Sequence, residues 1–477
     1  TSLRANSLDP NYFRTIALLL HKQHFGTQIR TCSHHHMNVL NLLAKDLNVN
    51  GLPVAREHQK VFRFQNNGTF NRKANTVTAG GFVIKDFSTL FVGQVHHDQL
   101  GFDGPAVMDR RYEDKDLAAP LQSAEQIAVL MDRLGFGTLW LAEHHFQREG
   151  YECIPNVLLL ATHLASVTKQ IKFGCGFNVL PTWHPLRLAE DYSMADNLTQ
   201  GRVRLGVGRG YHSREVDAFR HPLASPEDAR ELFEEQVQLL LAALREKSFS
   251  HHGRFYQVPA KGAIYRGQEL NDLTLVPKPQ FSTECWQPVV SASDRALDFM
   301  IDNGIKGFIG GGAASGGASE EIARRWQTKL AERGRETELG ADLIFGFSFY
   351  LADTEQEAKK DGKLILEEYQ KMFAPLGFAG EVTDDQLNRL GNPLTAATAG
   401  MGSIDDAVSS GSWIVGPSER LIETFEELQQ NFPGLEEVMV AQPVGAQPST
   451  VLSQLERFGE EVLPNFVKKA SSAAGVK

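Results

Sequence analysis

One short stretch of the chain places an acid and two histidines directly after an apolar run. The stretch is LWLAEHHF, residues 139–146, and it contains Glu143, His144 and His145. Its bulky apolar start is typical of a buried strand, and side chains just past the end of a barrel strand often face an active site. A histidine there can donate or accept a proton near neutral pH. We therefore expect acid–base chemistry, although one histidine could instead cap the loop while the other contacts its aromatic neighbour.

A metal centre is the second chemistry that histidines can support. His96 and His97 follow an earlier apolar stretch and could join His144 and His145 as ligands. These four residues contain no pair at the i, i+4 spacing that puts two ligands on one face of a helix. Three more histidines, at residues 34–36, are typical of a solvated loop. We therefore expect no metal in this protein.

Two further motifs have residue types that bind a phosphate group. Arg209 lies in the sequence GRGY after an apolar stretch, and Ser293 begins the sequence SDRAL, which predicts a helix. A guanidinium group and the free N–H groups at a helix N-terminus both suit a phosphate. Ordinary alternatives stay open, because Arg209 could form a surface ion pair with Glu215 and Ser293 could simply cap its helix.

Strands and helices must hold these residues in place, and the two alternate from about Ser88 onward. Apolar strands are predicted in TLFVGQV, TLWLA, IKFGCGFNVL, RVRLGVG, PVVSAS, GFIGG, DLIFGFSFYLA and EEVMVAQP, and the first helix is expected to begin at Ser123. Repeated strand–helix units indicate a parallel sheet covered by helices. No GxGxxG motif follows the first strand, which argues against an open dinucleotide-binding sheet. The pattern predicts an α/β fold, a (β/α)8 TIM barrel.

Residues 245–285 and 376–415 are too long and irregular to be barrel turns. We expect them to be insertions at the carboxyl-terminal face of the strands, where substrate lids usually lie.

The composition limits the classes to which the protein can belong. The chain has 477 residues, of which 42% are apolar, a net charge of −10 and a pI of about 5.9. An acidic chain is a poor nucleic-acid binder, and no run approaches the roughly 18 apolar residues of a membrane span. The four cysteines are scattered, which is typical of a reducing compartment. We expect no nucleic-acid partner, no membrane insertion and a cytoplasmic location.

The first residues differ in charge from the rest of the chain. Residues 1–85 contain eleven lysines and arginines but only three acids. An acid-poor leader of this kind can be a targeting peptide or an appended sequence. We therefore divide the chain into an N-terminal extension, residues 1–87, and a barrel, residues 88–470.

Three motifs occur in an order that resembles the bacterial luciferase-like flavin monooxygenase family. They are EHHF at 143–146, LPTWHPLRLAED at 180–191 and GRVRLGVGRGY at 201–211. Each motif alone is modest, but their order and spacing together are specific. The resemblance extends over roughly residues 88–466 and is densest between 134 and 235.

The resemblance implies a luciferase-like barrel that binds reduced FMN at the strand ends and uses O2. Carried over to this sequence, His144 matches the family's catalytic histidine. The residues that match those binding the FMN phosphate are Arg209, Arg230 and Ser293. Ala292 stands where luciferase has an acid, and Gly208 stands where it has a reactive cysteine. These departures argue against identical chemistry but not against flavin binding.

The resemblance also implies the reaction. A separate flavin reductase would supply FMNH2, O2 would add at the flavin C4a position, and a small organic substrate would receive one oxygen atom. Related proteins are commonly dimeric, so a homodimer is expected. Two alternatives stay open: an F420-dependent oxidoreductase that transfers hydride on the same barrel, and a non-catalytic flavin-binding protein. The presence of His144 favours an enzyme over the second alternative.

Related barrels also carry a cis peptide bond between non-proline residues beneath the flavin ring, and the matching bond here joins Gly176 and Phe177. Glycine lowers the steric cost of such a bond because it has no Cβ. Both residues are therefore expected to support the cofactor. The alternative is a β-bulge at Gly174 or Gly176.

Overall fold

The computed structural model describes residues 84–467, except for 221, 222, 224, 291, 312, 313 and 378–381. The chain divides into two units, residues 1–78 and 79–477, and the barrel lies in the second. Most of the predicted N-terminal extension and the three histidines at 34–36 lie outside the described residues.

Eight parallel strands close into a barrel, which confirms the predicted (β/α)8 fold. In barrel order they are β1 (Asp86–Phe91), β2 (Thr138–Leu141), β3 (Lys172–Cys175), β5 (Val203–Gly208), β10 (Cys285–Pro288), β11 (Ile305–Ile309), β12 (Leu343–Leu351) and β14 (Glu437–Ala441). The barrel closes where Asp86 of β1 pairs with Glu437 of β14. A short strand, β4 (Asn178–Val179), pairs with the carboxyl end of β5.

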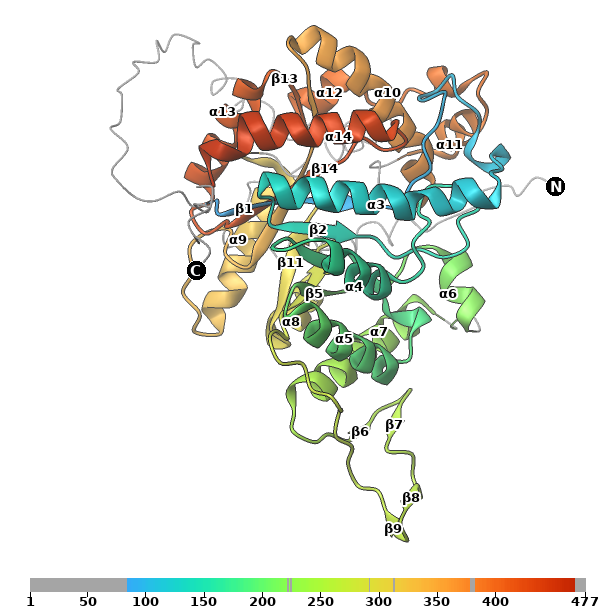
Figure 1. Cartoon of the computed structure of the whole chain (residues 1–477), viewed down its shortest axis with the longest axis vertical. Coiled ribbons are helices and arrows are strands. Elements are labelled where there is room, and N and C mark those ends of the chain that lie inside the picture. The colour runs from blue at the N-terminus through green and yellow to red at the C-terminus, as the bar shows by residue number, and fades with distance from the viewer. Residues whose placement is uncertain are drawn as a thin grey trace, which may run out of the picture. The chain divides into compact units, whose positions relative to one another are not determined.

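Helices surround the strands, as Figure 1 shows for α3, α4, α5 and α14. They are α3 (Asp114–Leu134), α4 (Val157–Val167), α5 (Pro185–Thr199), α6 (Ser213–Phe219), α7 (Pro226–Arg245), α8 (Asp294–Asp302), α9 (Gly317–Glu332), α10 (Glu355–Phe373), α13 (Ser418–Asn431) and α14 (Pro448–Arg457). Several begin with a side-chain cap, such as Asn156 on α4 and Ser225 on α7, which satisfies a free N–H group of the first turn. Among the described residues, no helix is both long and apolar enough to cross a membrane.

Several element boundaries differ from the sequence prediction, and β1 itself begins at Asp86, before residue 88, where the barrel was expected to begin. Helix α3 begins at Asp114 rather than Ser123 and contains Pro120, a residue that normally ends or bends a helix. Strand β10 begins at Cys285, upstream of the predicted PVVSAS, because the Trp286 side chain is buried inside the barrel. That interior is filled by an aromatic and aliphatic cluster: Trp140, Trp286, Phe308, Ile344 and Met439.

The two long insertions lie at different ends of the barrel. The first joins the end of α7 to the start of β10 and contains the short strands β6 (His251–His252), β7 (Gln257–Val258), β8 (Ile264–Tyr265) and β9 (Gln268–Glu269). Its ends lie at the amino-terminal end of the strands, because Arg245 contacts the backbone oxygens of Thr283 and Asn303. Figure 1 shows its hairpins extending away from the barrel. The expected position at the carboxyl-terminal face therefore does not apply to this insertion.

The second insertion does lie at the carboxyl-terminal end. It contains α11 (Asp384–Leu390) and α12 (Ile404–Ser409) and leads into β13 (Trp413–Gly416), which extends the sheet beside the last residues of β12. Its apolar side chains pack against Phe102, from the loop after β1. This insertion thus covers part of the face at which the candidate site lies.

Candidate active site

The predicted catalytic histidine is held by a carboxylate that comes from a different strand end. His144 lies in the loop after β2 and is 7% exposed. Its Nδ1 atom is 2.9 Å from Oε1 of Glu215, in the first turn of α6. The backbone N–H of His145 donates to the same oxygen at 2.9 Å. Glu215 therefore fixes both the ring and the loop that carries it.

The protonation of Glu215 determines which nitrogen of His144 can react. Burial favours the neutral carboxyl group, but the hydrogen bond and the charge of His144 outweigh it and lower the pKa of Glu215. The ionised carboxylate only accepts hydrogen bonds, so Nδ1 of His144 carries a proton and donates it. Proton transfer must then take place at Nε2.

The Nε2 atom of His144 has two neighbours. The Tyr211 hydroxyl and Oε1 of Glu152 each lie 3.1 Å from it. Burial opposes the charged form of His144, but Glu152 and Glu215 outweigh burial, so the pKa of His144 is raised. Burial, followed by the charge of Glu152, also raises the pKa of Tyr211 well above its usual value, so Tyr211 keeps its proton.

Glu143 holds the loop after β2 against the segment after β3. Its Oε1 atom accepts hydrogen bonds from Nε1 of Trp183 at 2.8 Å and from the backbone N–H of Val179 at 3.2 Å. It also lies 3.2 Å from Nε2 of His145. Of the three residues in EHH, only His144 has a nitrogen that faces Tyr211 and Glu152. The other two position the loop.

The predicted phosphate-binding residues lie at the ends of two neighbouring strands. Arg209 directly follows β5, and Ser293 caps α8 after β10, with its hydroxyl 3.4 Å from the N–H of Ala296. Strands β5 and β10 pair with each other in the barrel. Arg209 is exposed and has no ion pair with a described residue, so the alternative pairing with Glu215 is wrong. A guanidinium group, a hydroxyl and a helix N-terminus are donor types that suit a phosphate.

Arg230 is linked to the same helix start through a shared acid. Glu227 forms ion pairs with Arg230, at 3.5 Å, and with Arg295, in the first turn of α8. Two ion pairs, which share Glu227, thus link Arg230 to the helix that Ser293 caps. To contact a phosphate it would have to exchange Glu227 for the ligand.

The peptide bond between Gly176 and Phe177 is cis, as predicted. The ring of Phe177 packs at the top of the interior cluster, with centroid distances of 6.3 Å to Trp140 and 5.7 Å to Phe308. A Cβ atom at Gly176 would lie 3.3 Å from side-chain atoms of Leu90 and Trp140, so a larger residue would press on the cluster. The pair lies where β3 ends, on the same face as His144.

Sequence reasoning alone does not find Glu152, His212 or Glu215 as members of the site. His212 and Glu215 are three residues apart at the start of a short helix. This spacing is the one feature of the sequence that could have indicated that they belong to the site. Glu152 lies in an irregular loop whose path no periodic pattern predicts. Their places depend on how the loops after β2 and β5 meet.

His144, Glu152 and His212 each offer one metal-ligand atom, and these atoms lie within 4.8 Å of one another. The two histidines face different oxygens of Glu152, at 3.1 Å and 3.4 Å, which is the arrangement of a hydrogen-bonded chain.

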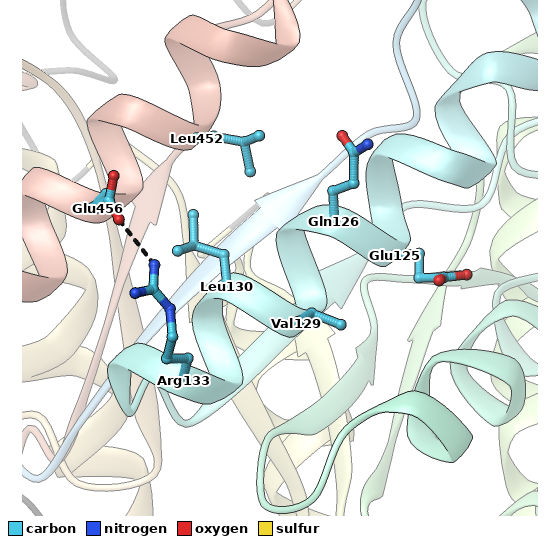
Figure 2. A pocket seen from close by; sticks show the side chains of 7 residues that line it. All are labelled: Glu125, Gln126, Val129, Leu130, Arg133, Leu452 and Glu456. Carbon is cyan, nitrogen blue, oxygen red and sulfur yellow. Dashed lines mark hydrogen bonds and ion pairs between the residues drawn. The ribbon is translucent and has the colours of Figure 1, made fainter.

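A surface groove between α3 and α14 is a separate feature. Figure 2 shows that it is lined by Leu130, Leu452 and neighbouring side chains, with Arg133 and Glu456 forming an ion pair of 2.8 Å beside it. The lining contains no histidine and no cluster of buried polar groups. We therefore do not assign it to the chemistry at the strand ends.

A closed (β/α)8 barrel with a histidine–carboxylate pair at its carboxyl-terminal face defines a barrel enzyme with an acid–base centre. The family model described as luciferase-like monooxygenase matches residues 96–433, so the chain belongs to that family. This confirms the predicted family and the expectation of a flavin-dependent monooxygenase.

The individual relatives share about a quarter to a third of their residues with this chain over the matched regions. Limonene 1,2-monooxygenase of Rhodococcus erythropolis is 23% identical over 74% of this chain and 83% of its own length. The oxygenase component of the flavin-dependent trigonelline monooxygenase of Acinetobacter baylyi is 31% identical over 38% of this chain and 45% of its own. A solved structure with the same fold is the oxygenating constituent of 3,6-diketocamphane monooxygenase from Pseudomonas putida, in complex with FMN. It has a TM-score of 0.60 at 17% identity, and the match covers 80% of this chain and 99% of that chain. Several curated relatives match this chain over less than half of their length.

Proposed function

We propose that the protein is an FMN-dependent monooxygenase that oxygenates a small organic substrate with O2. The observation that carries the proposal is the pair of His144 and Glu215, with Nε2 of His144 at the carboxyl-terminal face of the barrel. Arg209 and Ser293, at the ends of the neighbouring strands β5 and β10, supply a phosphate-binding donor set on that face.

Reduced FMN, when bound, would supply the electrons that activate O2. The chain's own residues would hold its phosphate through Arg209, the Ser293 hydroxyl and the N-terminus of α8, with Arg230 as a further candidate. Gly176 and Phe177 would form the floor beside the flavin ring. The interior cluster beneath Phe177 is apolar, and exclusion of water favours oxygen transfer over loss of the oxygen as peroxide.

His144 would act as the general acid and base of the reaction. Its Nδ1–H is held by Glu215, so the ring keeps one orientation while Nε2 gains or loses a proton. The raised pKa of His144 favours its charged form, which can donate a proton.

Two partners belong to the proposal. A separate reductase would supply the reduced flavin, as the name "oxygenase component" of the trigonelline enzyme suggests for that relative. A second copy of the chain would cover the exposed apolar side chains of Leu159 on α4 and of Met194 and Leu198 on α5. These two helices are neighbours in the barrel, so the three side chains belong to adjoining helices.

The test begins with the binding of chemically reduced FMN under anaerobic conditions. Oxygen is then admitted in the presence of candidate small organic substrates, and O2 uptake is compared with substrate oxygenation. Coupled oxygenation would support the proposal. Preferential binding and turnover of reduced F420 would favour the hydride-transfer alternative. Flavin binding without turnover of any substrate would favour a non-catalytic protein.

A further inference from the structure

Glu152 lies between two histidines and faces a different one with each of its oxygens. Its Oε1 atom is 3.1 Å from Nε2 of His144, and its Oε2 atom is 3.4 Å from Nε2 of His212. The side chains of His144 and Glu152 are 7% and 4% exposed, and that of His212 is 11% exposed. The three groups form a continuous chain whose outer end is His212.

The surroundings of Glu152 leave it available for proton transfer. Its ion pairs with described residues are both with histidines, which can lose their charge, and not with lysine or arginine. Arg214, the nearby guanidinium group, instead binds Glu149 at 3.0 Å. A buried charge is usually paired, and both ion-pair partners of Glu152 are imidazole rings, which can accept or donate a proton.

We propose that Glu152 relays protons between His144 and His212, and that His212 connects the buried His144 to the surface of the site. The inference deepens the proposed function, because it supplies the proton that His144 gives up during the reaction. It names Glu152 and His212 as positioning and relay residues for His144.

Each step of the relay conserves protons. The N–H bond at Nε2 of His212 breaks as an O–H bond forms at Oε2 of Glu152. A half turn of the carboxyl group about its Cγ–Cδ bond then exchanges the two oxygens. The O–H bond breaks as an N–H bond forms at Nε2 of His144, and Glu152 is again a carboxylate. His212 begins this cycle as an imidazolium, is left neutral by the transfer, and regains its proton from a hydronium ion in the solvent.

Besides Tyr369, whose pKa burial and the charge of Glu152 raise, four groups among the described residues face this chain. Tyr211 lies 3.3 Å from Oε1 of Glu152 and keeps its proton, so it orients the carboxylate without titrating. Glu215 fixes Nδ1 of His144, and the charge of Glu143 also acts on that ring. The Nε2 atom of Gln147 lies 3.4 Å from His212 and 3.3 Å from Glu215. None of the four connects the two histidines as Glu152 does.

The relay can be tested on the flavin-free chain by NMR with isotopically labelled histidine. The measured quantity is the rate at which the ring N–H protons of His144 exchange with water. Glu152→Gln keeps the shape of the side chain but cannot carry a proton, and His212→Gln keeps a polar group at the outer end. Each variant is expected to slow exchange by about 10²-fold, the lower end of what a positioned acid or base contributes. Added imidazole should restore exchange in a His212→Ala variant.

The matched control is Glu149→Gln, which removes a buried carboxylate from the same loop but contacts neither histidine. Its exchange rate should stay within about twofold of the parent, because only groups on the route affect the transfer. Parent-like exchange in Glu152→Gln would overturn the relay. Slow exchange in Glu152→Gln together with normal exchange in His212→Gln would overturn the role of His212. Because the measurement requires no flavin, a chain that fails to bind FMN would refute the proposed function and leave the test of the relay intact.

Discussion

The Nδ1 atom of His144 and Oε1 of Glu215 are 2.9 Å apart, although 71 residues separate them in the chain. His144 follows β2 and Glu215 follows β5, and β3 is the only barrel strand between those two. The side-by-side packing of these three strands therefore creates the pair, and the EHH loop obtains its fixed orientation from a helix far along the sequence. The chemistry of the site depends on this contact.

His144→Ala should leave the fold and flavin binding largely intact and reduce oxygenation by about 10²- to 10⁴-fold, the usual contribution of a general acid or base. The reason is that His144, alone in the EHH sequence, has a nitrogen, Nε2, that faces both Tyr211 and Glu152. Circular dichroism and flavin titration would verify that the variant is folded. Coupled turnover equal to that of the parent would remove His144 from the mechanism.

Glu215→Gln should lower the pKa of His144, because the Glu215 carboxylate is one of the groups that raise it. The pKa of Glu215 is lowered and that of His144 is raised. Both groups are therefore charged, and the ion pair is formed, at pH values between these two pKa values. Its stabilisation is lost as pH falls through the pKa of Glu215 and as pH rises through that of His144. Histidine NMR titration should show the variant losing its proton at lower pH. An unchanged titration curve would contradict the assignment.

Arg209→Ala should weaken the binding of FMN but not of riboflavin, which lacks the phosphate. A hydrogen bond to a charged group contributes about 1.5–3 kcal/mol, which corresponds to roughly 10- to 100-fold in affinity. Arg187→Ala is the control, because Arg187 is an exposed residue on α5 that pairs with Glu190 and Asp191. Equal losses for FMN and riboflavin would indicate that Arg209 supports the loop and not the phosphate.

The sequence predicted the repeating architecture better than it predicted the site. Strands such as β12 and helices such as α13 are marked by apolar periodicity that extends over the whole element. Helix α3 begins nine residues before Ser123, and Pro120 hides this extension because proline normally interrupts a helix. His144 could be found from its motif. Glu152 could not, because its position depends on the path of an irregular loop and on contacts made after the barrel closes.

Gly174→Ala should destabilise the barrel. A Cβ atom at Gly174 would lie 2.1 Å from the ring of Trp140, which is fully buried and cannot move aside. Overpacking of a core typically costs about 1–3 kcal/mol and occasionally more. Gly402→Ala is the matched control, because a Cβ there would meet no atom within 4 Å. Thermal unfolding of the two variants gives the comparison, and equal midpoints would show that the Trp140 region is less rigid than its packing implies.

The last prediction concerns residues 1–78, the first of the two units, which we propose are not required by the barrel. A chain that begins at Ala79, the boundary between the two units, should remain folded and should bind FMN as the full chain does. A chain that begins at Ser88 should aggregate, because it lacks Ile84 and Phe87, which are both fully buried. It also lacks Asp86, whose pairing with Glu437 helps to close the barrel. Burying each of the two apolar side chains contributes about 1.5–3 kcal/mol, a large share of the 5–15 kcal/mol by which a typical domain is stable.

Size-exclusion chromatography and flavin titration of both truncated chains, beside the full chain, test the boundary. Aggregation of the chain that begins at Ala79 would show that residues before it complete the core, and solubility of the chain that begins at Ser88 would show that the first half of β1 is dispensable.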